Sequence, residues 1–310
     1  MNLFKAVGFK LLSALLFAGL SALVRQLGDA VPVGQLVFFR SVCAIPPVLL
    51  IYAYRGELGV AVRTARPFGQ LGRGMLSIGG MYSNFSALMR IPLADVTAIS
   101  FASPLITGAL AAFILKERVR LYRWTAVLVG FAGVIVMLIP HLDPTHYSAA
   151  AGATAVATTG AIFAVTAAFC NAGTVIQTRR LTQSEATSSI VFYFSLVTTL
   201  AGAVTLPFDW HTPTGSELLA LIMLGVFGGV GHIFLTESYR HAPASVVAPF
   251  DYTSMLWALL LGYWMFGELP SVLVYVGGMI VAGAGLYVIW RERKLGLQRA
   301  RETEDPTSAV

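Results

Sequence analysis

The feature that most constrains this chain is a series of ten apolar stretches that fill most of its length. A helix needs about 20 apolar residues to cross about 30 Å of hydrocarbon. Only 12% of the residues are charged, whereas a soluble domain carries roughly 25%. Because lipid offers the backbone no hydrogen-bond partner, uninterrupted apolar runs predict helices. The predicted spans are residues 5–26, 32–54, 69–89, 93–114, 121–140, 155–178, 187–206, 217–238, 243–266 and 270–290.

One apolar pattern occurs twice in the chain. Residues 92–117 align with residues 243–268 without a gap, at an offset of 151 positions. The matched positions include Pro92 with Pro243, Phe101 with Tyr252, Ser103 with Ser254, Phe113 with Trp264, and Glu117 with Glu268. Each half holds five predicted spans, an odd number, so the second half must start on the opposite side of the membrane. Inverted repeats of this kind are typical of secondary transporters, whose substrate site lies where the repeats meet.

The positions of Lys and Arg predict the orientation. With the N-terminus in the cytoplasm, only Arg25 and Arg90 fall on the far side, while Arg40 and Arg73 lie within spans. The remaining cations, Lys5 and Lys10 among them, lie on the cytoplasmic side, which predicts that both termini are cytoplasmic. The net charge of +6 therefore indicates membrane topology, and no nucleic-acid partner is expected.

The motifs resemble those of the drug/metabolite transporter superfamily, in its ten-helix form with two EamA-type repeats. The resemblance rests on IPLADVTAISFASPLITGALAAFILKE (91–117) with VLVGFAGV (127–134), and on HAPASVVAPFDYTSMLWALLLGYWMFGE (241–268) with VAGAGLYVIW (281–290). It implies an all-α membrane protein of two inverted five-helix repeats in the bacterial inner membrane. It also implies a central cavity bordered by the first, third, fourth, sixth, eighth and ninth spans. The expected divisions are a first repeat at 1–140, a periplasmic linker at 141–154, a second repeat at 155–290 and a cytoplasmic tail at 291–310.

The resemblance implies a secondary active transporter working by alternating access. Our first prediction is export of amino acids or similar small organic metabolites. The alternative is uptake of a vitamin-like or nucleoside-like compound such as riboflavin or S-adenosylmethionine. An intramembrane enzyme is the weaker alternative, because the sequence has no Walker A, HExxH or GxSxG motif and Asp95 lies too near a span entrance to pair with Asp251. The expected partners are a small-molecule substrate, the lipid bilayer and protons as a coupling ion; no cofactor or metal is expected.

Asp251 is the sharpest candidate for the site. Polar groups inside a bilayer are costly and normally face a cavity or a partner. One face of the fourth span carries Thr97, Ser100, Ser103 and Thr107, and the matching face of the ninth carries Ala248, Asp251, Ser254 and Ala258. Asp251 is therefore expected to bind a cationic group of the substrate or to couple transport to protons. The alternatives are a structural ion pair with Arg40 and, for the hydroxyls, bonds to their own helix.

Five other polar or charged side chains have two readings each. Arg40 could bind a substrate carboxylate or brace helices while its charge reaches the interface. His232 could line the cavity and titrate near neutral pH, or pack without titrating. Asn84 and Asn171 could offer donors and acceptors to a substrate, or join helices. Ser100 belongs to the polar face described above.

Aromatic side chains recur near the same positions. They could stack on a flat or apolar substrate, or pack within the protein and against lipid. The candidates are Tyr82, Phe101, Tyr252 and Trp257.

Overall fold

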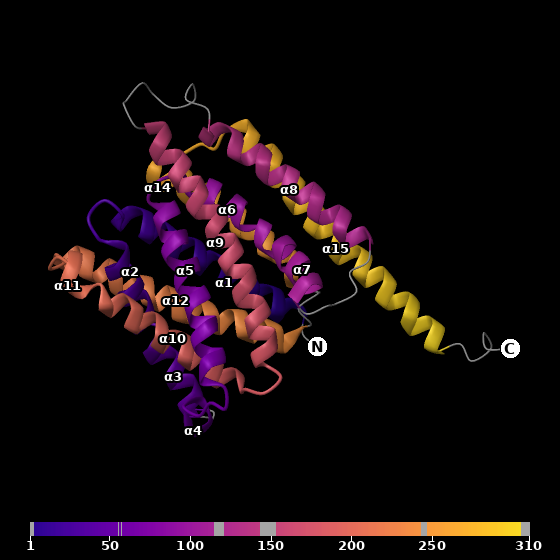
Figure 1. The fold of residues 1–310 in the computed structure, drawn as a ribbon, viewed down its shortest axis with the longest axis horizontal. Helices are drawn as coiled ribbons and strands as arrows, with labels where there is room; N and C mark the ends of the chain where they lie inside the picture. The colour runs from indigo at the N-terminus through magenta and orange to yellow at the C-terminus, as the bar shows by residue number, and fades with distance from the viewer. Residues whose placement is uncertain are drawn as a thin grey trace.

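The computed structural model describes residues 3–54, 56, 58–114, 121–142, 153–242 and 247–304. Within these ranges every regular element is a helix, as predicted (Figure 1). The elements are α1 (Leu3–Leu27), α2 (Val33–Val42), α3 (Ile45–Tyr54), α4 (Leu58–Ala61), α5 (Pro67–Leu88), α6 (Leu93–Ser100), α7 (Ala102–Ile114), α8 (Leu121–Leu142), α9 (Ala153–Leu181), α10 (Thr187–Val204), α11 (Leu206–Asp209), α12 (Gly215–His241), the 3₁₀ helix η2 (Ala248–Tyr252), α14 (Thr253–Phe266) and α15 (Val272–Glu304).

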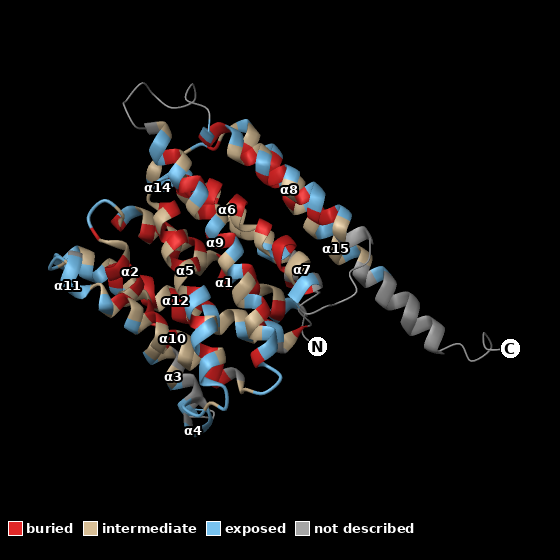
Figure 2. Ribbon diagram, in the orientation of Figure 1, coloured by how far each residue is buried: buried red, intermediate tan, exposed pale blue. Residues whose placement is uncertain are grey.

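The outer faces of the bundle are apolar. In the described part of the chain, seven helices are long and apolar enough to cross a membrane, and shorter apolar helices complete the set. Large side chains such as Leu128, Ile135 and Met279 are exposed on α8 and α15, and exposed positions run along these helices in Figure 2. Such an extensive exposed apolar surface is unfavourable in water but is stable in contact with lipid. The molecule is a multi-pass membrane protein.

Close helix pairs build the interior. Helix α1 packs on α12, α5 on α9, α8 on α15 and α2 on α10. In the first pair Ser13 donates a hydrogen bond to the Gly231 carbonyl (2.8 Å) and Ser238 donates to the Ala6 carbonyl (2.7 Å), so the two helices run antiparallel. Each of these pairs joins one helix from each predicted half. This arrangement supports the inverted repeat, which remains a prediction.

Three spans predicted as continuous helices are divided in the structure, which corrects the sequence analysis: the second into α2 and α3, the fourth into α6 and α7, and the ninth into η2 and α14. Helix α6 ends at Ser100 and α7 begins at Ala102. Pro104 has no amide hydrogen for the Ser100 carbonyl, which removes one helical bond at the break. In the second copy, η2 ends at Tyr252, the position that aligns with Phe101. The rings of Phe101 and Tyr252 touch, with centroids 4.9 Å apart.

Other boundaries differ more modestly from prediction. Helix α15 continues beyond residue 290 to Glu304. The aligned residues Pro243 and Glu117 lie outside the described residues, as do 143–152 of the predicted linker. The repeat limits and the orientation of the termini remain predictions.

Candidate functional site

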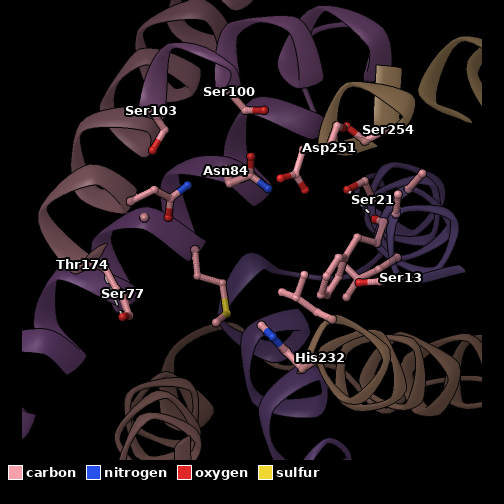
Figure 3. A pocket seen from close by; sticks show the side chains of 18 of the residues that line it. Ser13, Ser21, Ser77, Asn84, Ser100, Ser103, Thr174, His232, Asp251 and Ser254 are labelled. Carbon is pink, nitrogen blue, oxygen red and sulfur yellow. Dashed lines mark hydrogen bonds between the residues drawn. The ribbon is translucent and has the colours of Figure 1, made fainter. Parts of the chain in front are cut away.

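A cavity of about 750 Å³ lies at the centre of the bundle (Figure 3). Its walls come from the six predicted spans that the family resemblance implies, and also from α2 and α10 of the second and seventh spans. The cavity is lined by seven of the predicted substrate-binding residues: Arg40, Asn84, Ser100, Phe101, Asn171, His232 and Asp251. The structure brings these seven residues together at one cavity, and their role in substrate binding stays a prediction.

The polar lining follows helical stripes. On α1 the cavity-facing side chains are Lys10, Ser13, Phe17 and Ser21. On α5 they are Arg73, Ser77, Gly80 and Asn84. Spacings of three and four residues keep such side chains on one face of a helix. Each stripe thus turns toward the cavity while the rest of its helix packs on neighbours.

Asp251 forms an ion pair with Lys10, not with Arg40 as the structural alternative had it. Lys10 Nζ lies 2.6 Å from Asp251 Oδ1, and the side chains are 2% and 56% exposed, respectively. Lys10 also donates to the Tyr239 hydroxyl at 3.3 Å and lies over its ring. A buried ammonium needs a partner, and Asp251 supplies it. The carboxylate nevertheless remains open to the cavity.

Arg40 and His232 lie together on the cavity wall. Arg40 Nη2 is 3.5 Å from His232 Nε2, and the imidazole stands edge-on to Phe17, with ring centroids 5.0 Å apart. Thr236, one turn on, donates to the His232 carbonyl. The histidine therefore lines the cavity and also packs against an aromatic ring, while its titration near neutral pH stays a prediction.

The amides of Asn84 and Asn171 face the cavity. Among the described residues, neither side chain has a hydrogen-bond partner, so the interhelical bonding given as their alternative role is not observed. Figure 3 shows Asn84 and Asp251 pointing into the same space. Both amides are free to donate and accept hydrogen bonds from a bound solute.

The hydroxyls of the fourth span bond mainly within their own helix. Thr97 donates to the Leu93 carbonyl, Ser100 to that of Thr97 and Thr107 to that of Ser103. Thr97, Ser100 and Ser103 line the cavity, while Thr107 is buried away from it. A hydroxyl that donates to its helix keeps lone pairs that can accept from a solute.

Three predicted aromatic residues do not line the cavity. The Tyr82 hydroxyl donates to the Ala201 carbonyl at 3.4 Å, and the Tyr252 hydroxyl lies against Gly285 of α15. Trp257 Nε1 is buried without a hydrogen-bond partner in the described part of the chain. These rings support helix packing; Phe101 is the predicted aromatic that reaches the cavity.

Sequence reasoning missed Lys10, Arg73, Tyr239 and Phe194, all of which line the cavity. Lys10 was read only as a topology signal. Two signals for these residues were available in the sequence. Lys10 has a helical spacing from Ser13, and Arg73 lies on the same face of α5 as Asn84. No group of three or more His, Cys, Asp or Glu side chains within the described ranges is placed to hold a metal ion.

Arg25 lies next to Leu88, a residue of the cavity lining. This guanidinium forms an ion pair with Glu268 and donates to the carbonyls of Leu88 (2.7 Å) and Ile91 (2.8 Å). The Glu268 carboxylate also accepts from the Leu93 amide at 3.0 Å. These four contacts, the Arg25 network, join the ends of α1, α5 and α14 to the start of α6. Leu88, Ile91 and Leu93 are fully buried around it.

One protein-family model, described as the EamA-like transporter family, matches the chain twice, at residues 4–139 and at residues 158–291. The chain belongs to the EamA-like transporter family. Membership places this EamA-like protein among small-molecule transporters rather than enzymes. The two matches fall in the two halves of the chain.

Several named relatives match most of this EamA-like transporter. The "S-adenosylmethionine uptake transporter" of Rickettsia prowazekii is 30% identical, with 87% of each chain covered. The "Pseudopaline exporter CntI" of Pseudomonas aeruginosa (strain UCBPP-PA14) is 29% identical, covering 88% of this chain and 92% of the relative. The "Riboflavin transporter" of Rhizobium johnstonii is 28% identical, covering 77% and 76%. A solved crystal structure shares the fold, with a TM-score of 0.63, 21% identity and coverage of 95% and 99%.

Proposed function

We propose that this transporter carries small organic metabolites with a cationic group, of which amino acids and their conjugates are the simplest, by alternating access. The observation that carries the proposal is the Asp251 carboxylate, which is exposed in the central cavity while its lysine partner is buried. A carboxylate placed in this way can accept charge-assisted hydrogen bonds from an ammonium group and attract a sulfonium group by its charge.

The ion pair suggests how a solute cation would be received. Lys10 lies behind Asp251, held by Tyr239, so the open side of the carboxylate faces the cavity. An arriving cation can share Asp251 with Lys10 and displace water without leaving the buried lysine unpaired. Asn84 and Asn171 offer further hydrogen bonds around the bound solute. Proton coupling through Asp251 remains a prediction within this scheme.

Alternating access would require the Arg25 network to open. With both termini in the cytoplasm, as predicted, the Arg25 network lies on the periplasmic side, and we propose that it closes the cavity there. The broken helices α6–α7 and η2–α14 touch at Phe101 and Tyr252 beside the cavity. Interrupted helices at a midplane site are typical of carriers built from repeats, and we propose that these breaks allow the two end segments to move.

The proposal is compatible with two classes of solute, which the protein would transport in opposite directions across the membrane. Export of amino acid-like metabolites is our first proposal, from the sequence. Uptake of S-adenosylmethionine is the second, and the relatives of that name, at 28–30% identity over most of the chain, favour it. The ammonium and sulfonium groups of that solute suit Asp251, and Phe17 and Phe101 offer rings to its adenine.

A solute panel in proteoliposomes tests the proposal. Wild-type protein is expected to carry labelled L-methionine or S-adenosylmethionine and not riboflavin, which has no cationic group. The paired variant Lys10→Met/Asp251→Asn removes both charges without stranding either, and should lower transport at least about ten-fold. The control Asp29→Asn removes a carboxylate from an exposed loop outside the cavity and should change nothing. Full transport by the paired variant, or riboflavin as the sole substrate, would refute the proposal.

A further inference from the structure

Three side chains from three helices form a cluster on the cavity wall. Arg40 of α2 and Arg73 of α5 both lie over the ring of Phe194 of α10, with guanidinium carbons 5.5 Å and 5.2 Å from the ring centroid. All three line the cavity. The negative face of an aromatic ring attracts a cation, so a single ring brings two positive charges together. We call these three residues the arginine clamp.

Within the described residues, the clamp has no anionic partner of its own. Asp251 pairs with Lys10, Glu268 with Arg25 and Asp95 with His141, and no carboxylate in this part of the chain forms an ion pair with Arg40 or Arg73. Two guanidinium groups at one site repel each other, and a low-dielectric environment strengthens that repulsion. The site therefore favours an anion that can neutralise both.

Neutral groups hold the two guanidinium groups in place. Arg73 Nε donates to Thr178 Oγ1 at 2.7 Å and its Nη1 donates to the Ile190 carbonyl at 3.3 Å. These bonds use Nε and Nη1 and leave Nη2 available. Arg40 Nη2 lies beside His232 Nε2 at 3.5 Å. A planar guanidinium fixed in this way is preorganised for a planar acceptor such as a carboxylate.

We propose that the arginine clamp binds the carboxylate of the transported solute. This inference rests on the proposed function, in which Asp251 receives the cationic group. His232, and with it Arg40, lies across the cavity from Asp251 in Figure 3. A solute with both charges would span the cavity between the two sites. The clamp thus selects zwitterionic metabolites over simple amines, and charge-assisted or bidentate hydrogen bonds give it the strength to do so.

Matched solute pairs test the clamp in proteoliposomes. One pair is S-adenosylmethionine and its decarboxylated form; the other is L-methionine and 3-(methylthio)propylamine. Within each pair the cationic groups are kept and only the carboxylate is lost. Wild-type protein should carry the carboxylate-bearing member at least about ten-fold faster. In Arg73→Gln and Arg40→Gln that ratio should fall toward one, and Arg73→Lys should restore part of it because the charge returns without the planar fork.

Arg90→Gln is the matched control. Arg90 also lies over a ring, that of Phe163 at 5.1 Å, and donates to a helix carbonyl, but it does not line the cavity. Its removal should leave the ratio unchanged.

The outcomes separate this inference from the proposed function. Wild-type protein that carries both members of a pair equally would overturn the clamp and leave the cation-binding function in place. Wild-type protein that carries none of the four solutes would overturn both. A clamp variant that slows both members equally, with the ratio kept, would show that the arginines only brace α2, α5 and α10, and would overturn the inference.

Discussion

At the scale of single residues, the ion pair between Lys10 and Asp251 is asymmetric, because the lysine is buried and the carboxylate is exposed. Removing the carboxylate strands a buried ammonium, whereas removing the lysine leaves a carboxylate that water can reach. An unsatisfied buried group costs about 1–3 kcal/mol, and more when it is charged. The two halves of the pair should therefore contribute differently to stability.

We expect Asp251→Asn to lower the free energy of unfolding by about 1–3 kcal/mol. Lys10→Met should cost less, since methionine fills a similar volume with no charge to solvate. Adding Lys10→Met to Asp251→Asn should recover part of the loss. Thermal unfolding of the purified variants in detergent measures all three. Equal destabilisation by both single variants would contradict the assigned burial.

Helix geometry explains which of the predicted site residues face the cavity. Asn84 and Tyr82 were both predicted to contact substrate, but at about 100° per residue they point to nearly opposite sides of α5. The structure turns Asn84 to the cavity and Tyr82 to α10. The sequence placed both at a suitable depth, and only the packing of neighbouring helices decides which face is inward.

At the scale of elements, glycines set how closely α12 approaches α2. Gly225 and Gly229 form a GxxxG pattern, and the Gly225 Cα faces the Cβ of Cys43 and the carbonyl of Phe39. No methyl group fits there without moving the backbone of one helix. Small residues of this kind let membrane helices pack in contact.

Gly225→Ala should therefore lower the free energy of unfolding by about 1–3 kcal/mol, the usual cost of overpacking a core. Gly215→Ala is the control on the same helix, because an added Cβ there meets nothing within 4 Å. Thermal unfolding compares the two. If both variants unfold together with the wild type, the close approach of α12 and α2 is not as described.

Apolar periodicity predicted where helices run but not where they break. The runs at 93–114 and 243–266 read as continuous, whereas the structure interrupts them at Phe101 and through η2. Pro104 was the available signal for the first break. For the second, a 3₁₀ segment changes the hydrogen-bond pattern without changing composition, so hydropathy alone does not reveal it.

At the scale of the whole molecule, the Arg25 network joins α1, α5, α6 and α14 at one end of the cavity. If this end opens during transport, weakening the network should expose the cavity from that side. Sequence analysis assigned Arg25 only a topological role and left Glu268 out of the substrate site. Their pairing joins segments far apart in the chain and needed the fold to become visible.

Glu268→Gln should shift the protein toward the conformation in which the cavity is open at the end near Arg25. In a background with Cys43 and Cys170 replaced by alanine, the cavity-lining reporter Ser21→Cys should react with an impermeant thiol reagent from the Arg25 side. The reaction should be about five- to thirty-fold faster than with Glu268 intact, which corresponds to about 1–2 kcal/mol. Asp29→Asn, an exposed carboxylate in the loop after α1, is the control. Unchanged labelling in Glu268→Gln would show that the network does not close the cavity.

The central claim is that the cavity is the solute site of a carrier, and substrate counterflow tests it most directly. Proteoliposomes loaded with excess unlabelled L-methionine or S-adenosylmethionine are diluted into a trace of the same labelled solute. A carrier that alternates should accumulate label transiently above its equilibrium level, and the paired variant Lys10→Met/Asp251→Asn should abolish the overshoot while remaining folded. Simple equilibration without an overshoot in the wild-type protein, or an overshoot that the paired variant retains, would contradict the account.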